Sequence, residues 1–122
     1  MLDRPQFRPW NIELNGFCTL MHLSQLSGIL IPGLGFFLPI IMWISTKNES
    51  AQADAHGRII LNWMFSFFIY FIAIYNFFGW WGVTALIAYN FVFIIIGTIQ
   101  ANKGVSWRYP LSIPFFKAVT YN

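Results

Sequence analysis

Three side chains of this 122-residue chain have the chemistry of metal ligands or nucleophiles: Cys18, His22 and His56. Cys18 and His22 are four residues apart, so they share one face of a helix, and His56 follows in a later polar segment. Thiolate sulfur and imidazole nitrogen suit Zn²⁺, but two neighbouring ligands are too few for a site. We expect no bound metal and no other cofactor, and these three residues are only weak candidates for a metal site.

The same residues do not predict catalysis. A nucleophilic thiol needs a base and a group that orients the base, and the sequence places no such group beside Cys18 and His22. It also lacks a carboxylate cluster and a phosphate-binding loop. We therefore expect a protein that is not an enzyme.

A second polar set lies inside an apolar stretch. Asn62, Ser66 and Tyr70 follow one another at intervals of four, which places them on one helix face. We interpret them as helix-packing residues, since hydrogen bonds between membrane helices contribute roughly 0.6 to 2 kcal/mol each. The alternative is a polar path for a substrate or proton, but the apolar stretches contain no carboxylate to support it. The predicted packing residues are His22, Gln25, Asn62, Ser66, Tyr70 and the small pair Gly97 and Ala101.

The composition places these residues in a membrane protein. Hydrophobic residues make up 57% of the chain and charged residues only 9%, whereas a soluble domain has about 25% charged residues. A single cysteine excludes a disulfide scaffold, and the many aromatic residues exclude a disordered chain. The cations form no basic run, so nucleic acid is not an expected partner.

Two uncharged stretches separate the charged residues into three clusters. The second stretch, residues 59–102, is long enough for two helices of about 20 residues each. We expect the turn between them at Gly79 and Gly82, beside Trp80 and Trp81, whose rings suit the headgroup region.

The first stretch, residues 14–46, is shorter and is broken at Pro32, Gly33 and Gly35. Each of its arms would be about 21 to 24 Å long, against a hydrocarbon core of about 30 Å. We expect a short hairpin that either spans a thin region or is re-entrant, in which case lipid cannot satisfy the backbone of its turn. A third possibility is one kinked helix over residues 20–44.

The positive-inside rule favours the hairpin, because it leaves all seven Lys and Arg residues on one side, whereas a kinked single span moves Arg4 and Arg8 across. The sequence therefore predicts an all-α membrane protein of four hydrophobic helices in two hairpins, with both termini cytoplasmic. We expect a multi-pass protein of the bacterial cytoplasmic (inner) membrane.

Three segments follow from this topology: an interfacial or cytoplasmic arm over residues 1–16, a transmembrane domain over residues 17–102, and an interfacial aromatic and basic tail over residues 103–122. In the polar loop before the third helix, Asp54 is expected to cap the helix. The residues expected to contact lipid or a partner are Trp10, Trp80, Trp81, Trp107, Arg108 and Tyr109.

An ordered set of short elements resembles the Tic-twenty-like family of small bacterial membrane proteins, over roughly residues 20 to 117. The resemblance implies a compact four-helix membrane domain, in a family whose bacterial members are mostly of unknown function and whose chloroplast relatives are associated with protein translocation. The elements are His22-Leu23-Ser24, Ile31-Pro32-Gly33-Leu34-Gly35, Pro39 with Trp43, His56-Gly57-Arg58 with Asn62, and Tyr109-Pro110-Leu111-Ser112.

We therefore expect a non-catalytic accessory or assembly subunit of a larger inner-membrane complex. The expected partners are the lipid bilayer and other integral membrane subunits, because the chain is small and its short hairpin would be covered by other protein. The alternative function is a transport or translocation component that uses the Asn62, Ser66 and Tyr70 face.

Overall fold

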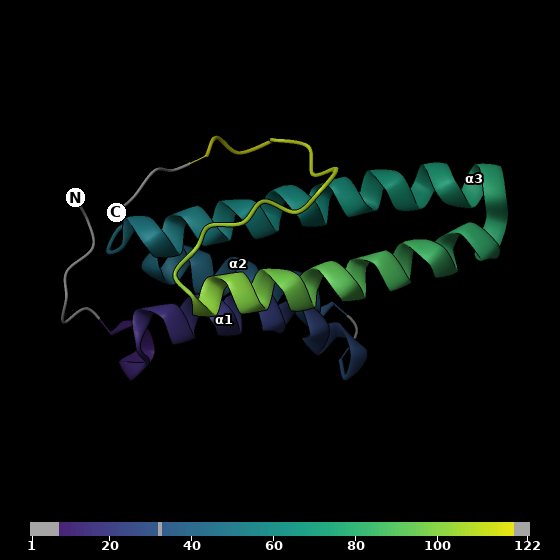
Figure 1. The fold of residues 1–122 in the computed structure, drawn as a ribbon. Helices are drawn as coiled ribbons and strands as arrows, with labels where there is room; N and C mark the ends of the chain where they lie inside the picture. The colour runs from purple at the N-terminus through teal and green to yellow at the C-terminus, as the bar shows by residue number, and fades with distance from the viewer. Residues whose placement is uncertain (1–7, 32, 119–122) are drawn as a thin grey trace.

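The computed structural model of the chain describes residues 8–31 and 33–118, and every regular element in these ranges is helical. The prediction of an all-helical fold is therefore confirmed for this part of the chain. Figure 1 shows the arrangement. The elements are η1 (Pro9–Asn11), α1 (Leu14–Leu23), η2 (Ser24–Ile29), α2 (Leu34–Thr46) and α3 (Ala51–Asn102).

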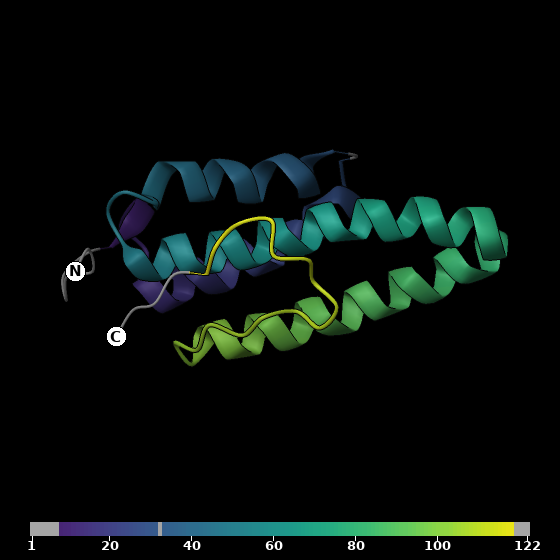
Figure 2. The same ribbon diagram turned by 90° about the horizontal axis from the view of Figure 1, so that it is seen from above.

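Helix α3 reverses direction at Gly79, so that it forms two antiparallel arms (Figures 1 and 2). Gly79 has φ 64° and ψ −152°, a backbone conformation that is open essentially only to glycine. We call residues 51–78 the first arm and residues 80–102 the second arm. Between the arms, the Trp63 Nε1–H donates a hydrogen bond to Asn90 Oδ1 at 2.7 Å.

Gly82 is not part of this turn, although the sequence suggested both glycines for it. It lies inside the second arm, where a Cβ atom would come within 2.5 Å of the Ile74 side chain and 2.8 Å of the Phe78 Cβ. Its small size therefore allows the two arms to approach each other just after the turn, while Gly79 alone makes the reversal.

The other helices form a shorter hairpin, which we call the first hairpin: α1 continued by η2, and then α2. Gly33 precedes α2 with φ 88°, whereas Pro32 lies outside the described residues. A Cβ atom on Gly35 would collide with the Gln25 carbonyl oxygen and lie 2.9 Å from the Gly28 amide nitrogen. The backbones of η2 and α2 are thus in direct contact near the turn.

Among the described residues, α3 is the one helix that is long and apolar enough to cross a membrane. The structure therefore differs from four separate membrane-spanning helices in two ways. The two predicted spans of residues 59–102 join at one glycine without a loop, and α2, at 13 residues, is about 20 Å long and shorter than the hydrocarbon core.

The four helical segments pack together at the end of the molecule where α3 begins and ends (Figure 2). One buried cluster there includes Phe17 and Cys18 of α1, Met42 of α2, and Ile60 and Ala101 of the two arms. Towards Gly79 only the two arms continue, and Trp81, close to the turn, is 89% exposed. The part of the core that all four segments share therefore lies at the end of α3 away from Gly79, whereas near the turn Val83 and Leu86 are buried between the two arms.

Ser50, not Asp54, caps the start of α3. The Ser50 Oγ accepts a hydrogen bond from the Ala53 N–H at 3.0 Å. Asp54 Oδ1 instead accepts from the Trp43 Nε1–H at 2.7 Å and from Arg58 Nε at 3.0 Å. Asp54 lies too far into the helix to cap it, so its carboxylate ties α2 to α3.

Residues 105–118 form an irregular tail that lies along the arms of α3 (Figure 1). It runs towards the Gly79 end, reverses near Leu111, which has φ 67°, and returns. At the other end of the chain, residues 1–7 of the predicted N-terminal arm lie outside the described residues, and η1 and the start of α1 make up the rest of that arm.

Candidate functional site

Side chains from three helical segments and the tail meet in one buried hydrogen-bonded group, which we call the polar cluster: His22, Gln25, His56 and Tyr109. The His22 Nδ1 lies 2.7 Å from the Tyr109 hydroxyl oxygen, and the His22 Nε2 lies 3.0 Å from the His56 Nδ1. Gln25 Nε2 donates to the Tyr109 hydroxyl at 2.9 Å. The side chains of His22, His56 and Tyr109 are completely buried.

The pattern of donors assigns the hydrogens of the cluster when both imidazoles are neutral. Tyr109 accepts from the Gln25 amide, so its own hydroxyl hydrogen is available to His22 Nδ1. A neutral His22 then carries its hydrogen on Nε2 and donates it to His56 Nδ1. Every hydrogen bond of the cluster therefore has one donor and one acceptor in the order Gln25, Tyr109, His22, His56.

The phenol of Tyr109 keeps its hydrogen in this arrangement. Burial raises the pKa of Tyr109 well above its ordinary value of about 10, because an apolar environment disfavours the phenolate. Tyr109 thus remains a neutral donor to His22 at any physiological pH.

The second arm of α3 closes the cluster at Gly97. A Cβ atom at this position would lie 2.8 Å from the Tyr109 hydroxyl oxygen and 3.0 Å from the His22 Nδ1. One turn further, Ala101 is fully buried in the cluster of apolar residues that includes Phe17 and Cys18. The two small residues thus lie against α1, and Gly97 also lies against the tail.

The tail is also held by the polar face that the sequence suggested for helix packing. Asn62 Oδ1 accepts from the Phe116 N–H at 2.6 Å, and Asn62 Nδ2 donates to the Phe116 carbonyl at 3.0 Å. Ser66 Oγ accepts from the Ile113 N–H at 2.7 Å. Tyr70 donates to the Leu111 carbonyl at 2.6 Å. The three side chains therefore bind the backbone of an irregular segment, not another helix.

Two tail residues expected at the lipid or partner interface are inside the protein. Tyr109 packs between Trp63 and His22, with ring centroids 6.0 and 5.6 Å away. Trp107 is partly buried and stacks on Phe93 at 5.9 Å. The expectation of exposed rings is wrong for Tyr109, because its hydroxyl has two polar partners, His22 and Gln25, that are distant in sequence and that no local pattern predicts.

The remaining interface residues are exposed. Arg108 donates to the Ser112 carbonyl at 2.6 Å and its side chain stays at the surface. Trp10, Trp80 and Trp81 each expose more than half of their surface. These four residues are thus placed where lipid or a partner can reach them.

The structure brings His22 and His56 together through a direct hydrogen bond. Their facing nitrogens bond to each other, and Cys18 lies one turn away on α1. Within residues 8–31 and 33–118, no group of three His, Cys, Asp or Glu side chains is arranged to hold a metal ion. The chemistry of the polar cluster is that of hydrogen bonding between buried neutral groups.

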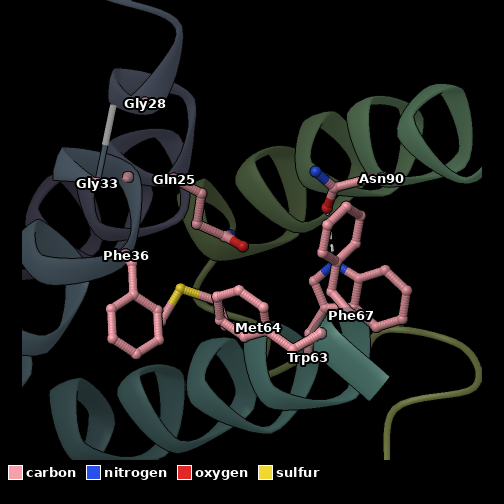
Figure 3. Close-up of a pocket in the computed structure, with 10 residues that line it drawn as sticks. Gln25, Gly28, Gly33, Phe36, Trp63, Met64, Phe67 and Asn90 are labelled. Atoms are coloured by element: carbon pink, nitrogen blue, oxygen red, sulfur yellow. Dashed lines mark hydrogen bonds between the residues drawn. The ribbon is translucent and has the colours of Figure 1, made fainter. Parts of the chain in front are cut away.

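Two apolar cavities share Trp63 in their lining, and the first of them also borders Gln25 of the polar cluster. One of about 400 Å³ lies under the turn of the first hairpin, between Gly33, Phe36, Met64 and Phe67, and Figure 3 shows Gln25 and Asn90 reaching towards each other across it. The other, of about 470 Å³, lies between the arms of α3, beyond the tail's reversal at Leu111. Neither is lined by a charged residue among those described.

Comparison with protein families matches residues 13–116 to the magnetosome magnetite crystal formation protein family (MamF/MmsF). This finding overturns the Tic-twenty-like resemblance. The elements behind that resemblance, such as the turn at Gly33 and the Tyr109-Pro110 pair, serve the turn of the first hairpin and the packing of the tail. No curated protein and no solved structure matches the chain.

Proposed function

Since the chain belongs to the magnetosome magnetite crystal formation protein family, we propose that it is a non-catalytic accessory protein of the magnetosome membrane. In this role it contributes to magnetite formation as a structural member of a larger membrane assembly. The bilayer and other integral membrane proteins are its partners, and the polar cluster keeps its membrane domain and tail in one defined arrangement.

The membrane location is supported by the apolar surface of α3. Residues 59–78 of the first arm are twenty in number, which corresponds to about 30 Å of helix and to the thickness of the hydrocarbon core. Phe77, Phe78, Trp80 and Trp81 at the turn expose their rings, as aromatic residues do in a membrane interface.

The orientation follows from the charges. Lys47, Arg58 and Lys103 lie at the end of α2, in the first turns of α3 and at the end of α3. Because α3 reverses at Gly79, all three lie at the end of the molecule opposite the turn. The positive-inside rule supports a cytoplasmic position for this end of the molecule and, as part of the proposal, for both termini.

The observation that carries the accessory role is the use made of the polar side chains. The polar cluster is enclosed, and the Asn62, Ser66 and Tyr70 face is covered by the tail that it binds. Both sets of polar groups hydrogen-bond within the protein and stabilise its fold. This use supports a structural role for the protein and not a polar path for a substrate.

The test deletes the gene of this protein in a magnetite-forming bacterium. Deletion should change the size or number of crystals seen by electron microscopy, and affinity capture of the wild-type protein at its natural level should recover a stoichiometric membrane assembly. Crystals unchanged by the deletion would contradict a role in magnetite formation.

Two conservative variants distinguish a structural role of the polar cluster from a catalytic role. Tyr109→Phe keeps the ring and removes the hydroxyl, and His56→Gln keeps a polar group without an imidazole. A structural role predicts that any crystal defect follows the amount of variant in the membrane, measured by immunoblot. Loss of crystals at a normal membrane level would contradict the non-catalytic assignment.

A further inference from the structure

The two halves of the membrane domain differ in cross-section. Next to the termini, α1 with η2, α2 and both arms of α3 lie side by side, whereas near Gly79 only the two arms remain (Figures 1 and 2). The turn of the first hairpin faces Trp63, Met64 and Phe67 of the first arm across the cavity. Next to it, Phe36 of α2 contacts Phe68 with ring centroids 5.5 Å apart. The first hairpin therefore stops well before the end of α3.

The tip of the first hairpin is apolar and uncovered. Ile29, Leu30 and Ile31 are 67%, 84% and 59% exposed. Phe68 and Ile69 of α3 are also exposed, and Phe68 lines the cavity under the hairpin turn together with Gly33. The tip and the side of α3 thus both expose apolar surface, which is suited to contact with hydrocarbon.

Several backbone groups of the described part of the tip are hydrogen-bonded within the hairpin, which lowers the cost of placing them in hydrocarbon. The amides of Leu30 and Ile31 both donate to the Ser27 carbonyl at 3.1 Å. The Leu34 amide donates to the Ile31 carbonyl, also at 3.1 Å. The hydroxyl of Ser27 donates to the Ser24 carbonyl at 2.6 Å. These hydrogen bonds reduce the number of polar groups that the tip would expose to hydrocarbon.

The depth of the tip follows from the rise of the helix. If the hydrocarbon core begins near Ile59, residues 64 to 68 lie about 8 to 14 Å inside it at 1.5 Å per residue. The midplane of the core lies about 15 Å from its edge. The first hairpin thus fills one leaflet only.

We infer that the protein has a wedge shape in the membrane and favours bilayers whose termini-side leaflet is convex, an inference that rests on the proposed membrane location. Four helical segments displace lipid in that leaflet and two in the opposite leaflet. Convex curvature gives the first leaflet the larger area. The acyl chains of the opposite leaflet fill the space beneath the tip, including the cavity next to Gly33 and Phe36.

Depth measurements test the position of the tip. The full chain is reconstituted in phosphatidylcholine–phosphatidylglycerol vesicles, with a fluorophore on Leu30→Cys or, as the reference, on Trp80→Cys; Cys18 is fully buried and does not compete for the label. Lipids spin-labelled near the chain end should quench position 30 more strongly than lipids labelled near the headgroup. Position 80 should show the reverse order.

The two positions distinguish the two proposals. A label at position 80 that is quenched by no lipid would show that α3 does not span, and both proposals would fail. If position 80 is quenched as expected but position 30 lies at headgroup depth, only the inferred wedge shape is overturned. The same holds if a second labelled copy of the protein covers position 30.

Membrane tubes pulled from giant vesicles test the curvature preference. Molecules with their termini outside should reach a higher density in the tube than in the parent vesicle. Molecules with the opposite orientation are the matched control, and they should be depleted from the tube. Equal densities in tube and vesicle for both orientations would overturn the inference.

Discussion

The His22 Nδ1 and the Tyr109 hydroxyl oxygen lie 2.7 Å apart although 87 residues separate them in the chain. This hydrogen bond joins the first helix to the tail in the interior of the protein. It makes the tail part of the core, and it makes the stability of the first hairpin depend on a segment that is irregular and distant in sequence.

Removal of the Tyr109 hydroxyl should destabilise the packing of both the first hairpin and the tail. Tyr109→Phe leaves the buried His22 Nδ1 without its donor and removes one of the two hydrogen bonds of the Gln25 amide, which costs about 1 to 3 kcal/mol. We expect a lower midpoint of thermal unfolding in detergent. Tyr75→Phe is the matched control, because the Tyr75 ring is 45% exposed, and it should leave the midpoint unchanged. Equal midpoints for the two variants would show that the hydroxyl of Tyr109 does not stabilise the fold.

A methyl group at position 97 should also destabilise the fold, in this case by overpacking. Gly97→Ala places a carbon 2.8 Å from the Tyr109 hydroxyl oxygen, and overpacking of this kind costs about 1 to 3 kcal/mol. The control is Gly16→Ala in α1, where the nearest atom is at 3.4 Å and alanine is the better helix former. Denaturant titration should show Gly97→Ala destabilised and Gly16→Ala neutral or stabilised; the opposite order would refute the close packing of the second arm.

The tail should become accessible when its anchor on the first arm is removed. Asn62→Ala loses both hydrogen bonds to the backbone of Phe116. Trypsin should then cleave faster after Arg108 and Lys117, as followed by mass spectrometry. Asn76→Ala serves as the control, since Asn76 only donates to the Ile72 carbonyl of its own helix. Cleavage at the wild-type rate in Asn62→Ala would argue against a tail held by this face.

Alkaline pH should destabilise the fold through Tyr109. Its pKa is raised by burial in the folded state and is about 10 when the chain is unfolded. The unfolded state therefore loses this proton first, so the stability contributed by the neutral phenol is complete below about pH 10 and falls as the pH rises further. Thermal unfolding between neutral and strongly alkaline pH should show the difference between wild type and Tyr109→Phe narrowing above about pH 10. A constant difference would contradict the shift.

The helical class and the two glycines at which the chain turns can be predicted from the sequence alone. Charge-free stretches of helix length and the glycines at positions 33 and 79 are local features, and a positive φ needs glycine whatever the surroundings are. The asymmetry of the two hairpins was also readable, because the length of an apolar stretch limits the length of its helices.

The partners of the polar side chains, in contrast, depend on how the helices and the tail pack together. The sequence showed that Asn62, Ser66 and Tyr70 share a face, but their partner is a tail without periodicity, so no pattern could identify it. Likewise, His56 and Tyr109 reach His22 only through the packing of α3 and the tail on α1. Periodicity describes which side chains share a surface, whereas the contacts of that surface come from the balance of packing and hydrogen bonding over the whole chain.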